Sequence, residues 1–239
     1  MLLITRPLAQ TRGLKILLKE ASINYALFPA FEVKKKPIKS ISQAYDVIIF
    51  ISTNAVNYAE DYFNQLFVGS YKVFAVGPIT AQRLAEKNIK VDCFPKTNAS
   101  SSELLLMKEC AELTGQKVLI VRGKGGSETI KNYLSKLNQV DYFEVYDRIP
   151  CEFTKLHSDS INIFMDSSKG VLMASSKENL SNTVRLLGAY NSNFLDEIKS
   201  KKMIVYSDRI KVYALKLGFV NIKVTSNPSD KDLINELIQ

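Results

Sequence analysis

A short apolar run that stops at an arginine and a cluster of glycines constrains this chain most. Residues 117–126 read KVLIVRGKGG, and a stretch of helical character follows. A short run of apolar, β-branched residues before a glycine turn is typical of a strand covered on both faces. The chain begins the same way, because LLIT ends at Arg6 and residues 11–21 carry apolar side chains at helical spacing. We therefore predict that a second copy of one β-α-β pattern starts at residue 117.

A second apolar run, over residues 45–54, favours a parallel sheet. It reads YDVIIFISTN, so a continuous apolar stretch ends in two hydroxyls and an amide. Such runs, alternating with helical patterns, are typical of parallel sheets with helices on both faces. Ligands of α/β proteins bind at the carboxyl ends of these strands. Ser52, Thr53 and Asn54 can therefore cap the next helix or contact a ligand.

Small polar residues also follow the other predicted strands. Gly77 precedes Pro78 and Thr80, so the backbone can turn tightly where the free amides of a helix point outward. A serine cap with Glu103 is predicted at residue 100 or 101. Each such turn is also a common structural device, so none of them identifies a ligand alone. The residues that this pattern brings to the strand ends are Gly77, Thr80, Ser102, Ser175, Ser176 and Ser207.

Length and composition fit two small globular domains. The chain has 239 residues, and domains commonly have about 100–150. Apolar residues make up 46% and charged residues 23%, which argues against disorder. The longest apolar runs have about five residues, far fewer than the roughly 20 that span a bilayer. Arg6 also interrupts any signal-peptide core. We expect a soluble, cytoplasmic protein without a membrane partner.

The net charge of +8 favours an anionic partner. Nucleic acid, an acidic surface and a polycarboxylate small molecule are the options, and a solvated lysine-rich surface is the plain alternative. The lysine runs at residues 34–36 and 199–202 are short and lie between predicted elements. Because no basic helix, zinc finger or aromatic RNA-binding strand is present in the sequence, we expect no nucleic-acid partner.

The sequence lacks the residues that several kinds of site and catalysis require. Cys93, Cys110 and Cys151 are widely separated, so neither a zinc site nor a disulfide framework is predicted. Hydrolase chemistry would depend on His157 alone, which we interpret as a surface or satisfied core residue. The glycine cluster at residues 123–126 lacks the spacing of a nucleotide motif. The residues alone indicate a two-domain α/β protein whose interdomain cleft binds an anionic small molecule.

Taken in order, the strand-end motifs resemble those of the uroporphyrinogen-III synthase family. The resemblance spans nearly the whole chain. The motifs are ITRP at residues 4–7, FISTNAV at 50–56, AVGPITA at 75–81, SELL at 102–105, LIVRGKGG at 119–126, VYDR at 145–148, LGF at 217–219 and PSD at 228–230.

The resemblance implies a fold of two flavodoxin-like parallel-sheet domains, joined by two extended linkers, with a cleft between them. The chain would start in one domain, cross to the other and return. The implied first domain comprises residues 1–33 and 153–239, the inserted domain residues 39–146, and the linkers residues 34–38 and 147–152.

The resemblance also implies a cofactor-independent, cyclising hydro-lyase of heme biosynthesis. Its substrate, the linear tetrapyrrole hydroxymethylbilane, loses a terminal hydroxyl as water, inverts its last pyrrole ring and closes to uroporphyrinogen III. The acetate and propionate groups of this substrate fit the positive charge and the amide-rich strand ends. Most of the catalysis would be positioning. We expect no metal, no cofactor and a monomer.

The site residues follow from the same resemblance. Tyr146 matches the family tyrosine on the returning linker and is the expected proton donor to the leaving hydroxyl, with an ordinary cross-strand aromatic as its alternative. Thr80 matches the family threonine. The other expected substrate contacts are Gly77, Ser52, Thr53, Ser102, Ser175, Ser176 and Ser207, with added charge from Arg6, Arg122 and Lys201 or Lys202.

Three positions depart from the family pattern. Ser127 stands where an arginine is common, Asp208 lies in a turn without the second threonine, and Arg148 follows the tyrosine closely. A non-catalytic binding or sensor protein for an anionic small molecule is the main alternative function, and the presence of Tyr146 argues against it. A nucleotide-dependent regulator is disfavoured, because the phosphate motifs are missing.

Overall fold

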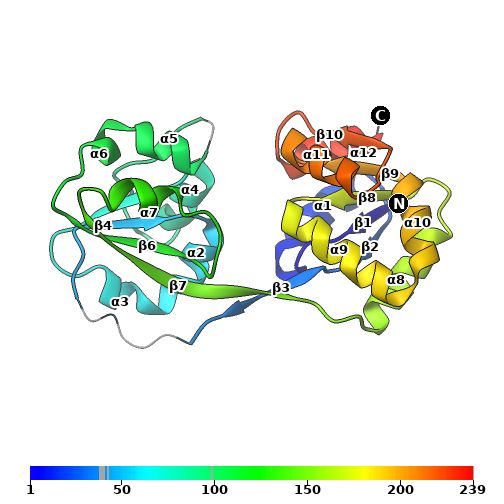
Figure 1. Ribbon diagram of the computed structural model, residues 1–239, viewed down its shortest axis with the longest axis horizontal. Coiled ribbons are helices and arrows are strands. Elements are labelled where there is room, and N and C mark those ends of the chain that lie inside the picture. The colour runs from blue at the N-terminus through cyan, green and yellow to red at the C-terminus, as the bar shows by residue number, and fades with distance from the viewer. Residues whose placement is uncertain (38–40, 42, 98, 239) are drawn as a thin grey trace. The chain divides into compact units, whose positions relative to one another are not determined.

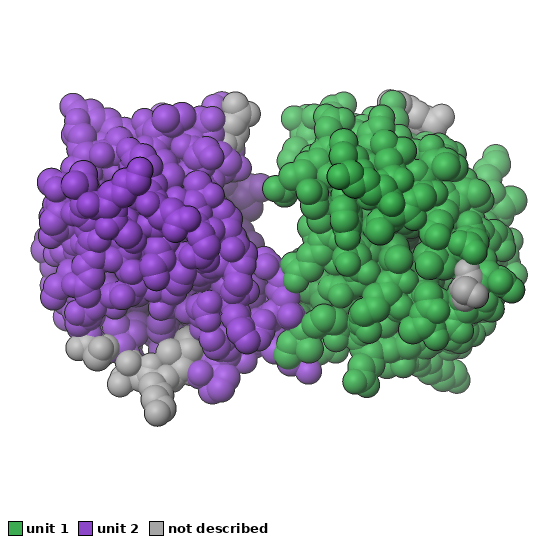
Figure 2. Space-filling view, viewed as in Figure 1, with its two compact units in different colours: residues 1–32, 149–239 green, residues 33–148 purple. Residues whose placement is uncertain are grey.

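A computed structural model describes residues 1–37, 41, 43–97 and 99–238 (Figure 1). The chain divides into two compact units, Met1–Glu32 with Ile149–Gln239, and Val33–Arg148 (Figure 2). Within the described residues, each unit contains one five-stranded sheet with helices on both faces. The predicted class, an α/β protein with two parallel-sheet domains, is confirmed.

The sheet of the first unit has the strand order of a doubly wound fold. Strand β1 (Leu2–Ile4) lies between the edge strand β2 (Tyr25–Leu27) and the central strand β8 (Val171–Ala174). Beyond β8 lie β9 (Lys202–Val205) and β10 (Ile222–Val224), and all four pairings are parallel. Counted along this unit, the order is 2-1-3-4-5, the flavodoxin-like order, with its switch point between β1 and β8.

Helices cover both faces of this sheet, because alternate strand residues point to opposite sides. Leu3 and Leu172 face one helical layer, whereas Leu2 and Met173 face the other. The first layer comprises α8 (Lys155–Met165), α9 (Lys177–Tyr190), α10 (Ser192–Ser200) and α11 (Asp208–Lys216). The second comprises α1 (Arg12–Glu20) and α12 (Asp230–Ile238), and the short η1 (Leu8–Gln10) precedes α1.

The second unit repeats this order with its chain permuted. From edge to edge its strands are β3 (Phe31–Lys35), β7 (Gln139–Pro150), β6 (Lys117–Gly123), β4 (Val47–Phe50) and β5 (Lys72–Ala75). Strand β6 pairs in parallel with β7 and β4, as β1 pairs with β2 and β8. A parallel bridge from β5 to Cys93 takes the place of β10. The β-α-β pattern predicted to start at residue 117 is therefore present, but the copy that it opens is divided between the two units. The second unit is a circular permutation of the first.

Six helices described in this unit cover its sheet on both sides. Ile48 and Phe50 of β4 pack under one layer, and Val47 and Ile49 pack under the other. The first layer comprises α2 (Thr53–Ala59), α3 (Phe63–Leu66) and α4 (Pro78–Ala85), with η2 (Glu60–Tyr62) between α2 and α3. The second comprises α5 (Ser101–Leu106), α6 (Lys108–Ala111) and α7 (Thr129–Leu134).

The chain passes between the units twice, and both passages are strands. Lys36 N–H donates to Val145 O at 3.0 Å and Cys151 N–H donates to Ala30 O at 3.2 Å. Residue 30 pairs with residue 151 and residue 36 pairs with residue 145, so β3 and β7 run antiparallel. The expected linkers at residues 34–38 and 147–152 are therefore partly strand. Residues 38–40, the end of the first linker and the start of the expected second domain, lie outside the described residues, and the expected domain limits stay a prediction.

The only histidine of the sequence is a satisfied core residue of the first unit. The backbone N–H of Thr154 donates to Nδ1 of His157 at 3.1 Å. Nε2 therefore carries the proton and donates to the carbonyl oxygen of Pro29 at 2.9 Å. The ring packs between Phe28 and Phe153. The imidazole thus connects the residues before β3 to those after β7.

No helix in the described parts of the chain is long and apolar enough to cross a membrane.

Candidate functional site

Serine side chains cap three helices that follow strand ends. The side chains of Ser52, Ser100 and Ser176 each accept a hydrogen bond from the amide three residues later, at 3.1, 3.1 and 3.0 Å. They begin α2, α5 and α9, and the cap of α5 is residue 100 rather than 101. Ser102 follows that cap and is exposed. These serines place the first amides of their helices at the carboxyl end of each sheet, where α/β proteins bind ligands.

The switch point of the first sheet is braced by two buried polar side chains. Asn179 Nδ2 donates to Thr5 O at 2.7 Å, and Thr5 Oγ1 lies 2.8 Å from both Asn179 Oδ1 and Met173 O. The backbone N–H of Ser175 donates to Asn179 Oδ1 at 3.2 Å. The brace therefore fixes the backbone that carries Ser175 and Ser176. Sequence reasoning missed Asn179, because an asparagine in a first helical turn carries no sign of burial.

The remaining candidates of the first unit lie at opposite ends of its sheet. Ser207 begins α11 without a side-chain capping bond, so its hydroxyl is not used by the helix. Lys202 starts β9, and its Nζ donates to the carbonyl oxygen of Glu236 at 3.0 Å. Because the strands are parallel, Lys202 lies at the amino end of the sheet, away from the serines. The geometry therefore separates Lys202 from the other candidates, and Lys201 next to it pairs with Glu197 at 3.8 Å.

Arg6 lies at the expected strand end but is already paired. Its guanidinium donates to both carboxylate oxygens of Asp230, at 3.1 and 2.6 Å, and to Tyr206 Oη. Burial alone would lower the pKa of Arg6, but the hydrogen bonds and charges of Asp230 and Tyr206 outweigh it and raise the pKa. Burial, followed by the charge of Asp230, raises the pKa of Tyr206 well above its usual value. Arg6 therefore adds little free positive charge for a ligand.

Gly77 and Thr80 begin α4 in the second unit. A Cβ on Gly77 would lie 2.2 Å from Cβ of Ala99, so a close approach of two chain segments requires this glycine. Pro78 takes the first helical position, as predicted. Thr80 is only 5% exposed. The turn thus brings one hydroxyl to the start of a helix.

Tyr146 lies on β7, in the core beside α2, and is 1% exposed. Its hydroxyl lies 3.3 Å from Ser52 Oγ, and Arg148 Nη2 donates to it at 3.4 Å. Its ring packs on Tyr58 with centroids 5.5 Å apart. The structure therefore brings two candidates together, Tyr146 and Ser52. Thr53, which follows Ser52, is the first residue of α2.

Arg122 is buried in the second unit and does not offer a free cation. Nε donates to Gly123 O at 3.0 Å, and Nη1 donates to Glu128 Oε1 at 3.1 Å. The guanidinium also lies 4.4 Å from the ring centroid of Tyr142. Because Arg122 is 1% exposed and held by its own unit, the expected direct contact with substrate would need these bonds to break. Its Nη2 is a buried nitrogen without a partner in the described residues.

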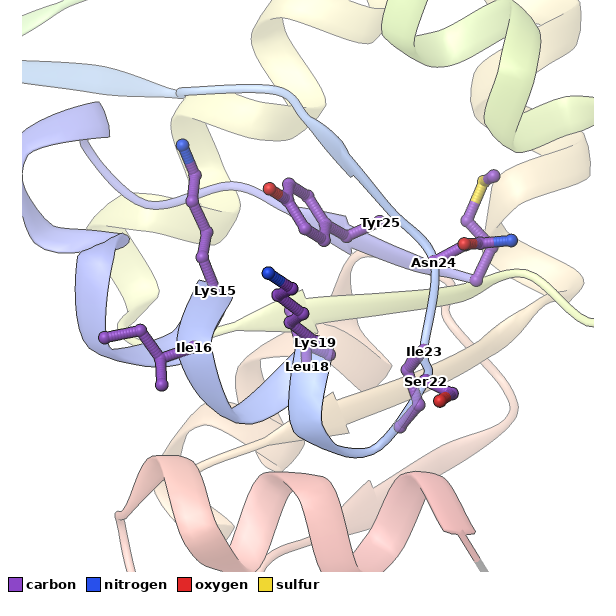
Figure 3. A pocket seen from close by; sticks show the side chains of 9 residues that line it. Lys15, Ile16, Leu18, Lys19, Ser22, Ile23, Asn24 and Tyr25 are labelled. Atoms are coloured by element: carbon purple, nitrogen blue, oxygen red, sulfur yellow. The ribbon is translucent and has the colours of Figure 1, made fainter.

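A hollow of about 690 Å³ lies at the amino end of the first sheet, away from all the expected contacts (Figure 3). Lys15 and Lys19 of α1 line it together with Tyr25, and Lys15 Nζ lies 6.0 Å from the tyrosine ring centroid. None of the residues expected from sequence to bind substrate lines this hollow. This hollow is therefore not the site that the sequence predicts, because the expected residues do not line it.

Two doubly wound units with hydroxyls and helix amides at their strand ends define a class of two-domain α/β proteins with ligand sites at those ends. A family model described as "Uroporphyrinogen-III synthase HemD" matches residues 13–235 of the chain. The chain belongs to the uroporphyrinogen-III synthase family, a family of cyclising lyases of heme biosynthesis.

Known relatives agree with this assignment. The uroporphyrinogen-III synthase of Escherichia coli (strain K12) is 25% identical over 197 residues, which cover 80% of this chain and 78% of that protein. The crystal structure of uroporphyrinogen-III synthetase from Helicobacter pylori 26695 matches with a TM-score of 0.65 and 16% identity, over 90% of this chain and 92% of that one. A mutant uroporphyrinogen III synthase from the extremely thermophilic bacterium Thermus thermophilus matches with a TM-score of 0.59 and 15% identity, over 100% and 98%. The two solved structures share the fold.

Proposed function

We propose that this protein closes hydroxymethylbilane to uroporphyrinogen III, with inversion of the last pyrrole ring. The match of the family model over residues 13–235 carries the proposal. The placement of the Tyr146 phenol beside Ser52, which caps α2, supports it. The positive net charge of the chain suits a substrate rich in carboxylates.

The first chemical step is the loss of the terminal hydroxyl. The carbon–oxygen bond of the hydroxymethyl group breaks, its electron pair leaves with the oxygen, and that oxygen takes a proton to become water. We assign the proton donor as the phenol of Tyr146. Its hydrogen-bond distances of 3.3 Å to Ser52 and 3.4 Å to Arg148 are long, so these bonds are weak. Because the phenol is 1% exposed, the surrounding residues have to move before a substrate hydroxyl can replace either partner. The carbon freed by this loss then bonds to the α-carbon of the last ring that already carries the chain. The old bond from that α-carbon to its bridge carbon breaks, and the bridge carbon bonds instead to the free α-carbon of the ring, which loses its proton, so the ring closes inverted.

Positioning supplies the rest of the reaction. A flexible chain must be held with its ends together and its last ring turned over, which lowers the entropy cost of closure. We assign this role to donors at the strand ends. We leave out Arg6, which is paired with Asp230, Arg122, which is buried within its own unit, and Lys202, which lies at the amino end of its sheet. The proposed donors to substrate carboxylates are Gly77 through its backbone, Thr80, Ser52, Thr53, Ser102, Ser175, Ser176 and Ser207.

The decisive experiment separates the two possible products. The purified protein is incubated with freshly generated hydroxymethylbilane, and the oxidised uroporphyrins are resolved by chromatography. Without catalysis the bilane closes spontaneously to isomer I, so we expect isomer III to dominate when the enzyme is present. Only isomer I from folded protein would refute catalysis and favour a non-catalytic protein that binds an anionic small molecule.

Two variants test the assigned residues. Tyr146→Phe removes the proposed proton donor and should lower the rate of isomer III formation by about 10²–10⁴-fold. Thr80→Ala removes a proposed hydrogen-bond donor to the substrate and should raise KM more than it lowers kcat. Ser100→Ala is the matched control, because that hydroxyl caps a helix and is not among the proposed contacts. A Tyr146→Phe variant with unchanged rate would move proton donation to another residue.

We also propose a cytoplasmic monomer that binds no nucleic acid, with domains at residues 1–33 plus 153–239 and 39–146. The family's substrate is a small molecule, and the chain carries no recognisable nucleic-acid motif. Light scattering at micromolar concentration checks the oligomeric state: a mass of 26.9 kDa is expected, and twice that mass would contradict the proposal.

A further inference from the structure

A β-bulge lies directly before Tyr146. In the pairing of β6 with β7, Arg122 lies opposite Glu144, but the next residue, Gly123, lies opposite Tyr146. Val145 is therefore an extra residue on β7. Such an insertion bends its strand and redirects the side chains that follow it, and bulges are common beside functional sites.

The bulge changes the face on which Tyr146 lies. Successive strand residues point to opposite faces, so Val145 and Tyr146 would normally lie on opposite sides of the sheet. Instead both belong to the core beneath α2 and α4, where Val145 is 0% and Tyr146 1% exposed. Without the extra residue, the phenol would lie on the α7 side with Tyr142. The bulge therefore directs the phenol toward Ser52.

The turn after β6 supports the redirected ring. A Cβ on Gly123 would lie 2.3 Å from Cε2 of Tyr146, so the ring rests directly on the glycine backbone. The next amide, Lys124 N–H, donates to the carbonyl oxygen of Tyr146 at 2.8 Å. Both the ring and the backbone of the tyrosine are thus held by residues 123–124.

Arg122 fixes this turn at its two ends. Nε donates to Gly123 O at 3.0 Å, while Nη1 donates to Ser127 O at 3.4 Å and to Glu128 Oε1 at 3.1 Å. A Cβ on Gly126 would lie 3.1 Å from Nη2, and the φ of +97° at Gly126 also favours glycine. The guanidinium therefore occupies the inside of the turn, which explains why a basic residue at a strand end is buried.

We propose that Gly123 and Arg122 are positioning residues for the reaction, because they hold the bulged Tyr146 phenol at the start of α2. The proposal rests on the proposed function only for the role of Tyr146 as proton donor. The position of the phenol can be tested separately from activity.

Gly123→Ala is the sharpest variant. The new methyl group requires the Tyr146 ring to move by about 1 Å to reach van der Waals distance, and a misplacement of about 1 Å can cost about 100-fold in rate. We expect kcat for isomer III to fall 10- to 100-fold with KM changed less than threefold. Gly13→Ala is the matched control, since nothing lies within 4 Å of its added Cβ, and it should keep the wild-type rate.

A double-mutant cycle separates positioning from general damage. If Gly123 acts through the phenol, Gly123→Ala should cost at most twofold in a Tyr146→Phe background. An equal loss in both backgrounds would overturn the proposal. Arg122→Lys, which cannot reach both ends of the turn in the same way, should follow the same pattern with a smaller loss.

Fluorine NMR tests the position of the phenol without turnover. With 3-fluorotyrosine throughout the protein, the Tyr146→Phe spectrum assigns the resonance of residue 146. That resonance should shift in Gly123→Ala and stay in place in Gly13→Ala, while thermal melts check that both variants are folded. An unmoved resonance, or a moved resonance with wild-type kcat, would overturn the proposal. If the wild type makes no isomer III, the proposed function fails, but the resonance still tests whether Gly123 and Arg122 hold the phenol.

Discussion

At the scale of single residues, His157 shows how one side chain can stabilise two distant segments. It accepts a hydrogen bond from the Thr154 amide and donates one to the Pro29 carbonyl, and both groups lie in the first unit. Without the imidazole the buried carbonyl of Pro29 would be left unpaired, whereas the amide of Thr154, an exposed residue, can bond to water.

We predict that His157→Ala lowers the free energy of unfolding by about 1–3 kcal/mol, because the buried carbonyl of Pro29 loses its partner. His157→Gln, whose amide can both accept and donate, should cost less than half as much. Urea titration measures both values. A loss below about 0.5 kcal/mol for the alanine variant, the size of a neutral surface change, would show that water replaces the ring.

The buried thiols make the stability depend on alkaline pH. Burial raises the pKa of Cys93 to about 11 and that of Cys110 to about 12, from an ordinary value of 9.0. The folded protein therefore keeps both protons at pH values where the unfolded chain loses them. Since stability falls wherever the folded state binds more protons, we predict a decrease in the free energy of unfolding as the pH rises from 9 towards 11.

Denaturant titrations at pH 8, 9 and 10 test this decrease. The double variant Cys93→Ala with Cys110→Ala should lose most of the pH dependence, although it is less stable at every pH. An unchanged slope in this variant would assign the alkaline effect to other groups, such as Tyr142, whose pKa burial and the hydrogen bond to Glu128 raise to about 12.

Charged residues were the least predictable part of the candidate site. The sequence correctly indicates that Arg6 and Arg122 lie at strand ends. This position alone suggests that both arginines bind an anion. It gives no sign that Asp230, 224 residues later, pairs with Arg6, or that Glu128 and Tyr142 surround Arg122. Partners that only the tertiary fold brings together decide whether a cation is free.

At the scale of helices and strands, the capping serines allow a matched comparison. Ser52 and Ser176 accept capping hydrogen bonds, whereas Ser207 begins its helix without one. We predict that Ser52→Ala and Ser176→Ala each lower the stability by about 1 kcal/mol and that Ser207→Ala changes it by less than about 0.3 kcal/mol.

Thermal melts and the KM for the bilane, measured on the same three variants, separate capping from binding. If Ser207 binds a substrate carboxylate, Ser207→Ala should raise KM without lowering the melting temperature. A melting temperature lowered as far as in Ser176→Ala would contradict the absence of a capping role.

Strand cores were predictable because their sequences are continuous and apolar. The four residues of β4, VIIF, are all buried, as expected for a central strand of a parallel sheet. The bulge at Val145 was not, because the alternation of side chains gives no sign of an extra residue until the partner strand is known. The same limit applies to β7, a strand of 12 residues that continues through part of the expected linker.

At the scale of the whole molecule, the first unit is interrupted by the second at a pair of antiparallel strands. Residues 30 and 151 are hydrogen-bonded, so Glu32 and Ile149 lie opposite each other by the same register. We predict that replacing residues 33–148 with Asn-Gly, which favours a two-residue hairpin turn, leaves a folded first unit.

Circular dichroism and a cooperative thermal transition would identify that folded unit, and no isomer III should form, because Tyr146 is removed. A chain without a cooperative transition would show that the first unit depends on the second. The repeat that starts at residue 117 could be read from the sequence, because both copies share the order of strand, arginine and helix. The circular permutation could not be predicted, because only the order of neighbouring strands in the folded sheets shows it.

The permuted order has a consequence during synthesis on the ribosome. Strand β1 is an internal strand of its sheet, yet its neighbour β8 begins at residue 171, after the entire second unit has emerged. At typical rates of translation the apolar segment Leu2–Ile4 therefore waits roughly 10–30 s for that partner. The second unit can fold while the ribosome is still working, so the newly made N-terminal segment is the part of the chain that most needs a chaperone.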